Sequence, residues 1–127
     1  MRRSRPFLEG IRILVVEDKT DFRLLIAGFL ERQGAQVFAA RNAFEGLRLF
    51  QEIRPEVVLS DINMPGRSGI QLLADIRALG RNDAGSVPVI AMTAYMLDRS
   101  LVDAGFQSIL RKPFEPDQLL TTIDSVL

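Results

Sequence analysis

The chain has 127 residues, a length that suits one domain with a buried core. Hydrophobic residues make up 47% of it and charged residues 25%, as is usual for soluble globular proteins. Sixteen basic residues balance sixteen acidic ones, so we expect no nucleic-acid binding by this chain alone. The lack of cysteine excludes disulfides and thiolate chemistry, and the lack of histidine excludes His-based triads and His-ligated zinc.

Residues 1–9 are expected to form a basic flank and residues 10–127 a single domain. The flank contains Arg2, Arg3 and Arg5, and a solvated tail explains it better than a nucleic-acid or lipid contact. No apolar run of signal-peptide or membrane-spanning length follows. We therefore expect a cytoplasmic chain that does not bind membranes by itself.

Short apolar runs and amphipathic stripes alternate along the chain. Ile11 and residues 13–16 form a run rich in β-branched side chains, which predicts a strand buried on both faces. The stripe that follows has helical spacing, and Gly34 ends it. Its members are Phe22, Leu25, Ile26, Phe29 and Leu30. We assign this stripe to the core.

The same strand–helix unit recurs four more times. Strands are predicted at residues 37–40, 57–59, 87–92 and 108–110. Asn42 is expected to cap the second helix, with Glu45 as its capping-box partner. Gly105 ends the fourth helix, which is predicted over residues 95–104, and Pro116 suits the first turn of the last helix.

This alternation predicts an α/β fold, a (βα)5 doubly wound parallel five-stranded sheet with helices on both faces, because parallel strands require crossover connections. The flavodoxin-like strand order 2-1-3-4-5 is the natural candidate. Ligands of such sheets bind beyond the carboxyl ends of the strands, at the point where the strand order reverses. Functional residues are therefore expected at this edge.

Polar residues follow four of the predicted strands at that edge. Glu17 and Asp18 end the first strand. Asp61 ends the third strand, Thr93 the fourth and Lys112 the fifth. Three carboxylates this close repel one another or raise each other's pKa unless a cation joins them. Oxygen ligands without histidine or cysteine select a hard cation, and a site with few carboxylates suits Mg²⁺.

The same residues suit phosphoryl transfer. An aspartate such as Asp61, held beside Mg²⁺, can attack phosphorus as a nucleophile. Lys112 would add positive charge against the phosphoryl group, and Thr93 a hydroxyl that reaches a phosphate oxygen only once the phosphate is present. Taken singly, each of these residues is more often a turn residue or a helix cap. Their combination on one edge of the sheet favours the functional interpretation.

Four stretches resemble the landmarks of the receiver domains of two-component response regulators. They are residues 14–18, 60–66, 92–94 and 112–114, and the resemblance covers about residues 10–127. It implies that Asp61 is the phosphoacceptor and that Asp18, with Glu17, supports Mg²⁺. It also implies that Asn63 contributes its backbone carbonyl to the metal.

The resemblance makes Thr93 the switch hydroxyl and Lys112 a phosphate contact, and it implies a cis bond between Lys112 and Pro113. One position departs from the pattern. Receivers commonly carry Tyr or Phe three residues before the lysine, whereas this chain has Ile109, so the aromatic half of the usual switch is missing. Tyr95 occupies a position that tunes access to the phosphoryl group in the family.

The resemblance implies a signalling module and not a free-standing catalyst. A histidine kinase or histidine phosphotransfer protein would donate a phosphoryl group to Asp61. The acyl phosphate would then switch the face formed by the fourth helix, fifth strand and fifth helix. Residues 8–18 look similar to receivers joined to sensor kinases, and a stand-alone receiver is the alternative. The sequence does not identify the downstream partner, and it leaves a homodimer open.

Three other functions fit the sequence less well. A pseudo-receiver that only binds proteins is favoured by Ile109 and opposed by the otherwise intact site. A haloacid-dehalogenase-like phosphatase would carry Asp-x-Asp on its first strand and would need room for a cap domain. An FMN-binding flavodoxin would need a phosphate loop rich in Ser, Thr and Gly, where this chain has Glu17 and Asp18, which repel phosphate.

Overall fold

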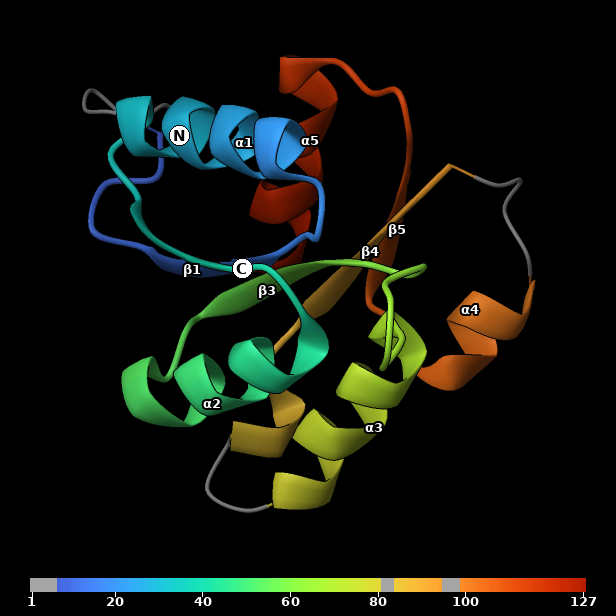
Figure 1. The fold of residues 1–127 in the computed structure, drawn as a ribbon. Coiled ribbons are helices and arrows are strands. Elements are labelled where there is room, and N and C mark those ends of the chain that lie inside the picture. The colour runs from blue at the N-terminus through green and yellow to red at the C-terminus, as the bar shows by residue number, and fades with distance from the viewer. Residues whose placement is uncertain (1–6, 81–83, 95–98) are drawn as a thin grey trace.

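A computed structural model describes residues 7–80, 84–94 and 99–127 of the chain. Within them, five parallel strands form one sheet in the order β2-β1-β3-β4-β5 (Figure 1). The α/β fold and the flavodoxin-like strand order predicted from the sequence are therefore confirmed. The expectations for Tyr95 and for the arginines of the basic flank fall outside the described residues.

Strands and helices alternate along the chain as predicted. The strands are β1 (Arg12–Val16), β2 (Gln36–Ala40), β3 (Val57–Asp61), β4 (Val89–Thr93) and β5 (Ser108–Arg111). The helices are α1 (Thr20–Arg32), α2 (Ala43–Ile53), α3 (Gly69–Leu79), α4 (Arg99–Ala104) and α5 (Pro116–Val126). A short 3-10 helix (Ala84–Ser86) lies between α3 and β4. In the described residues, no helix combines the length and the apolar character that crossing a lipid bilayer requires.

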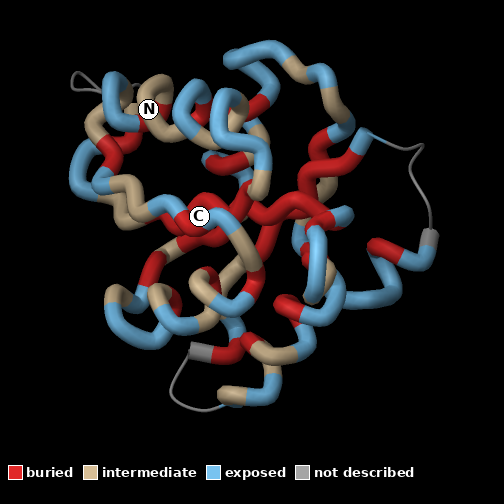
Figure 2. Tube along the Cα trace, viewed as in Figure 1, coloured by how far each residue is buried: buried red, intermediate tan, exposed pale blue. Residues whose placement is uncertain are grey.

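Helices cover both faces of the sheet, with α1 and α5 on one face and α2, α3 and α4 on the other (Figure 1). The central strands are buried along nearly their whole length (Figure 2). Alternate side chains of β1 belong to two separate hydrophobic cores, one on each face of the sheet. Leu14 and Val16 pack with residues of α2 and α3, whereas Ile13 and Val15 pack with residues of α1 and α5. This burial on both faces explains why the strands are continuous apolar runs.

One residue of the predicted stripe on α1 does not reach the core. Ile26 and Leu30 are buried, and Phe22 and Phe29 pack against the same core. Leu25, however, is 65% exposed, so its assignment to the core was wrong. The reason is geometric, because at helical spacing Leu25 lies at the border of the stripe and the α1–sheet contact is narrower than the apolar stripe.

Leu8, in the segment that we expected to be a basic flank, packs into the core. Leu8 is fully buried in the core between the sheet, α1 and α5. Its backbone N–H donates a hydrogen bond to the carbonyl of Gln33 at 2.8 Å, and the Gly10 N–H donates to the carbonyl of Gly34 at 3.0 Å. Residues just before β1 are thus tied to the end of α1.

Helix ends follow the expected capping chemistry with one difference. The Asn42 side chain accepts a hydrogen bond from the Glu45 N–H at 2.8 Å, as predicted for a cap. The difference concerns the predicted capping box. The Glu45 carboxylate accepts from the N–H of Arg41, one residue before the cap, at 2.8 Å. Pro116 lies in the first turn of α5, as expected.

The start of α3 is held by a capping box that the sequence analysis did not identify. The Ser68 hydroxyl accepts from the Gln71 N–H at 3.1 Å, and the Gln71 side chain accepts from the Ser68 N–H at 2.8 Å. The next residue, Gly69, donates its N–H to the carbonyl of Ile62 at 2.9 Å. These bonds fold the β3–α3 connection back onto the end of β3.

We predict that Gly69→Ala destabilises the protein, because an added Cβ would lie 2.1 Å from the backbone oxygen of Asp61, which cannot move away as a side chain can. We expect a loss of about 1–3 kcal/mol in the free energy of unfolding, measured by urea denaturation. Gly28→Ala is the matched control. A Cβ at Gly28 meets only the Arg32 guanidinium at 3.6 Å, so stability should be unchanged or higher. Equal stability of Gly69→Ala and the wild type would contradict the prediction.

Candidate functional site

The candidate site lies at the carboxyl edge of the sheet, where the strand order reverses. β1 has β2 on one side and β3 on the other, although β3 follows β2 in the chain. The register pairs Val16 of β1 with Ser60 of β3, so Glu17 and Asp61 follow these paired residues on neighbouring strands. Parallel strands end at the same edge, and this brings residues far apart in the sequence together.

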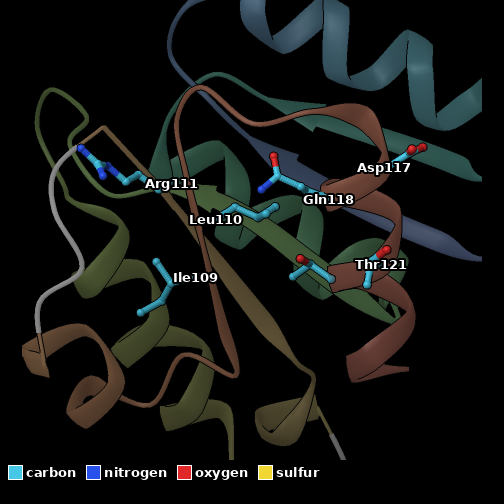
Figure 3. Close-up of a pocket in the computed structure, with 7 residues that line it drawn as sticks. Ile109, Leu110, Arg111, Asp117, Gln118 and Thr121 are labelled. Atoms are coloured by element: carbon cyan, nitrogen blue, oxygen red, sulfur yellow. The ribbon is translucent and has the colours of Figure 1, made fainter.

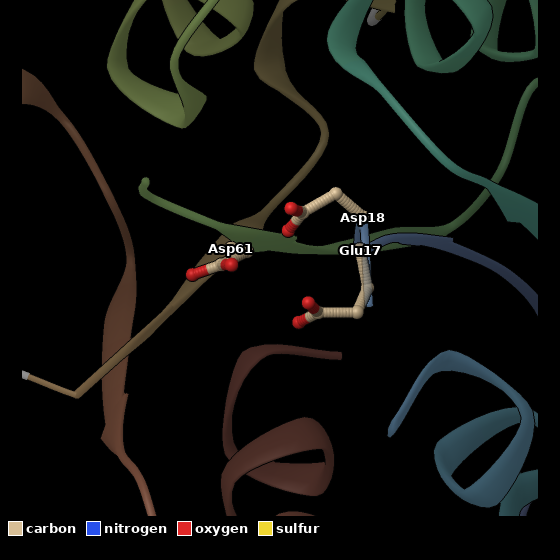
Figure 4. A group of neighbouring side chains, drawn as sticks. All are labelled: Glu17, Asp18 and Asp61. Atoms are coloured by element: carbon tan, nitrogen blue, oxygen red, sulfur yellow. The ribbon is translucent and has the colours of Figure 1, made fainter. Parts of the chain in front are cut away.

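Three carboxylates converge at this edge, as the sequence predicted. Glu17, Asp18 and Asp61 each place a carboxylate oxygen within 4.8 Å of the other two (Figure 4). Glu17 is fully buried and Asp61 is 6% exposed. Like charges in so little solvent repel strongly, so the cluster requires compensating positive charge.

The acidic cluster has the properties of a cation site. The Asp18 Oδ1 atom is buried and has no hydrogen-bond partner among the described residues. A buried oxygen without a donor is costly, and a bound cation would satisfy it. The donor set consists of oxygen atoms alone, which suits a hard divalent ion such as Mg²⁺. The residues present therefore fit the metal that the sequence analysis expected.

Lys112 supplies positive charge to the cluster. Its Nζ atom lies 3.0 Å from Glu17 Oε1 and 3.6 Å from Asp61 Oδ2. Its backbone N–H donates to the carbonyl of Thr93 at 2.7 Å, which anchors the end of β5 to the end of β4. The bond to Pro113 is cis, as the family resemblance implied. The ammonium is thus held between two of the three carboxylates.

Burial is the largest influence on Glu17 and raises the pKa of its carboxyl above the ordinary value of 4.5. The negative charge of Asp61 also raises this pKa. Hydrogen bonds from Lys112 and from the Lys19 N–H, the latter at 3.1 Å, act in the opposite direction but do not cancel the burial effect. Ionised Glu17 is therefore costly as long as no further cation is present.

Arg23 is a second cation at the site, and sequence reasoning missed it. Its guanidinium donates to the carbonyl of Glu17 at 2.8 Å and to that of Asp18 at 3.4 Å. These bonds fix the backbone of the acidic pair as it leaves β1. The available signal was its position in the first turns of α1, since side chains there tilt toward the start of the helix and so toward the carboxyl edge of β1.

The remaining predicted residues surround this cluster. Asp61 Oδ1 accepts from the Ile62 N–H at 2.8 Å, which leaves Oδ2 as the oxygen nearest to Lys112. Thr93 ends β4 and is buried. Asn63 is exposed in the connection that follows Asp61. Thus the structure places all of these residues at or beside the carboxyl edge.

Ile109 lies in β5, opposite Ala91 of β4, and is partly buried against the core on the α2–α3 side. It lines a shallow hollow of about 470 Å³, together with neighbouring residues of β5 and of the first turns of α5 (Figure 3). An isoleucine at this position packs as an aliphatic residue and has no ring to reorient toward Thr93.

A family model for the response regulator receiver domain matches residues 13–124. The chain is 31% identical over 120 residues to sporulation initiation phosphotransferase F of Bacillus subtilis, with 91% of this chain and 93% of that protein covered. It is 32% identical over 122 residues to the sensor histidine kinase AruS of Pseudomonas aeruginosa, with 94% of this chain covered but only 12% of the kinase. Relatives thus include both single domains and much longer proteins.

Solved structures agree with these relatives. The chemotaxis protein CheY4 of Vibrio cholerae superposes with a TM-score of 0.86 at 27% identity, covering 93% of this chain and 99% of that one. The receiver domain of sensor histidine kinase PA1611 from Pseudomonas aeruginosa, solved with a magnesium ion in its active site cleft, gives 0.82 at 28% identity, covering 92% and 97%. The chain belongs to the response regulator receiver domains of two-component systems, which are signalling modules and not free-standing catalysts.

Proposed function

We propose that this chain is a phosphoacceptor receiver domain in which Asp61 takes a phosphoryl group from the phosphohistidine of a histidine kinase or histidine phosphotransfer protein. The observation that carries the proposal is the meeting of Asp61 with Lys112 and two further carboxylates at the switch point of the sheet. Asp61 has one carboxylate oxygen held by a backbone N–H and the other turned toward the ammonium. This combination prepares a nucleophile and a phosphate contact in one place.

Glu17, Asp18 and Asp61 would hold Mg²⁺, together with the main-chain carbonyl of Asn63. The Asp18 oxygen, which has no hydrogen-bond donor in residues 7–80, 84–94 and 99–127, and the all-oxygen donor set support this assignment. When bound, the ion supplies positive charge that neutralises the oxygens of the incoming phosphoryl group. The protein itself contributes positioning, which is the main source of catalysis in phosphoryl transfer.

In the proposed transfer, an oxygen of Asp61 forms a bond to phosphorus as the P–N bond of phosphohistidine breaks. The electron pair of that bond returns to the donor's imidazole, and Asp61 becomes an acyl phosphate. Lys112 stabilises the negative oxygens of the phosphoryl group, and Thr93 donates its hydroxyl to one of them. Both side chains would thus contact the phosphoryl group on Asp61.

The acyl phosphate would bias the face formed by α4, β5 and α5 toward a second conformation. Ile109 makes this step unusual, because it provides no aromatic ring to follow Thr93. In this chain the movement of Thr93 would have to carry the signal without an aromatic partner. A downstream protein or a second copy of the chain would bind that face. The cytoplasmic location stays a prediction from the sequence.

The first prediction concerns covalent labelling. Incubation with acetyl phosphate and Mg²⁺ is expected to add one phosphoryl group to the wild type, because Asp61 is a nucleophile held beside the positive charge of Lys112. Intact-mass spectrometry measures the adduct. Asp61→Asn should abolish it, EDTA should suppress it, and Asp117→Asn, on the exposed start of α5, should leave it unchanged. No adduct on the wild type, under conditions that label a known receiver, would refute the proposal.

The second prediction concerns the metal. Asp18→Ala should weaken Mg²⁺ binding by about tenfold or more, because it removes a buried carboxylate oxygen to which no described residue donates a hydrogen bond. Asn63→Ala should change binding little, since only the main-chain carbonyl is assigned to the ion. Amide NMR titrations with MgCl₂ give both affinities. A similar affinity for Asp18→Ala and the wild type would rule out Asp18 as a ligand.

The third prediction follows from the raised pKa of Glu17. An acid with a raised pKa contributes stability that is full below its unfolded pKa and is lost as the pH rises through its folded pKa. Glu17→Gln should therefore gain stability relative to the wild type in EDTA as the pH rises above 4.5, the ordinary pKa of glutamate. Urea denaturation across this range tests the trend, with the exposed Glu52→Gln as control. Parallel curves for Glu17→Gln and the wild type would contradict it.

A further inference from the structure

The ammonium of Lys112 lies over an aromatic ring that the proposed chemistry does not use. Its Nζ atom is 4.5 Å from the centroid of the Phe22 ring. Phe22 belongs to the first turn of α1, whereas Lys112 follows β5. The negative face of an aromatic ring attracts a cation at this distance, and the attraction strengthens as water is excluded. The Lys112 side chain is only 18% exposed, so the contact is largely shielded.

A second aromatic ring, that of Phe114, sets the orientation of the Phe22 ring. Phe114, two residues beyond Lys112, meets Phe22 in an edge-to-face arrangement, with ring centroids 5.8 Å apart and an angle of 71° between the rings. Both rings are partly buried against the core on the α1–α5 side. Edge-to-face pairs are favourable and directional. The orientation of the Phe22 ring under the ammonium is therefore set by its neighbours and not by Lys112 alone.

We infer that Phe22 is a positioning residue, which holds the Lys112 ammonium over the carboxylates so that it can meet the incoming phosphoryl group. This inference rests on the proposed phosphoryl transfer to Asp61. An ammonium has three N–H donors, and the site needs them for Glu17, for Asp61 and for phosphoryl oxygens. The ring attracts the charge and leaves the three N–H donors available to the oxygens.

The ring also matters when the partners of Lys112 change. Before transfer, the ammonium contacts Glu17 and lies close to Asp61. After transfer, phosphoryl oxygens compete for the same donors. Because the face of Phe22 attracts the ammonium in both states, the charge stays in place while its hydrogen bonds are exchanged. An aliphatic side chain of similar size would cover the same core surface but would not attract the charge.

The test compares phosphorylation rates with acetyl phosphate at saturating Mg²⁺. Phe22→Leu should slow phosphorylation by about three- to tenfold, because part of the Lys112 population leaves the site. Phe22→Tyr retains an aromatic face and should restore most of the rate. Phe29→Leu is the matched control, since Phe29 lies about two turns further along the same helix and packs against the same core. Equal rates for Phe22→Leu, Phe29→Leu and the wild type would overturn the inference.

A fluorination series separates attraction from packing. Site-specific 4-fluoro- and 3,4,5-trifluorophenylalanine at position 22 preserve nearly the same volume while weakening the negative face of the ring. The rate should fall stepwise as fluorine atoms are added. A rate that depends on the removal of the ring but not on fluorination would show a packing role only, and would also overturn the inference.

A spectroscopic readout keeps the inference testable even if the proposed function fails. The Lys112 side-chain protons nearest the ring should show an upfield NMR shift in the metal-free protein, lost in Phe22→Leu and retained in Phe22→Tyr. If the wild type takes up no phosphoryl group, the proposed function fails. In that case the shift alone decides whether Phe22 holds the ammonium, and its absence in the wild type refutes the contact.

Discussion

The concentration of negative charge at one edge of a parallel sheet is the constraint on which the rest of the structure depends. Two strands buried on both faces end side by side and bring Glu17, Asp18 and Asp61 together with little solvent between them. Lys112 offsets part of this charge, and Arg23 holds the backbone of the acidic pair. One carboxylate oxygen, Asp18 Oδ1, still lacks a partner within the described part of the chain. A cation, and then a phosphoryl group paired with it, would enter a site whose electrostatics already favour them.

Much of the fold could be predicted because local and global signals agree. Apolar runs of β-branched residues mark strands buried on both faces, and glycines such as Gly34 and Gly105 adopt the left-handed backbone that ends a helix. Features that depend on the width of a tertiary contact escaped prediction. Leu25 matches the period of α1 but faces solvent, and Leu8 is fully buried although it precedes the first strand. Neither outcome is encoded in sequence spacing alone.

The residues of the candidate site likewise fall into a group that could be predicted from the sequence and a group that could not. Residues directly after strands could be predicted, because the ends of parallel strands share an edge whatever the details of packing. Residues that act from a helix could not, since the facing of Phe22 and Arg23 toward the carboxyl edge depends on how α1 lies against the sheet. The connection from β3 to α3 belongs to this second group. Gly69 leaves no room for a side chain beside the Asp61 backbone, so the same turn that starts α3 also sets the position of the carboxylate.

The hydrogen bond from Leu8 to Gln33 places the beginning of the packed chain beside the last turn of α1, at the amino-terminal edge of the sheet. α5 starts after the carboxyl end of β5 and runs back across the sheet before it ends at Val126 (Figure 1). Both ends of the packed fold thus lie away from the carboxylates. A linker joined at either end would leave the acidic edge open to diffusing partners. This geometry lets one unchanged unit serve as an independent protein or as a small part of a long one, which is the range of lengths found among its relatives.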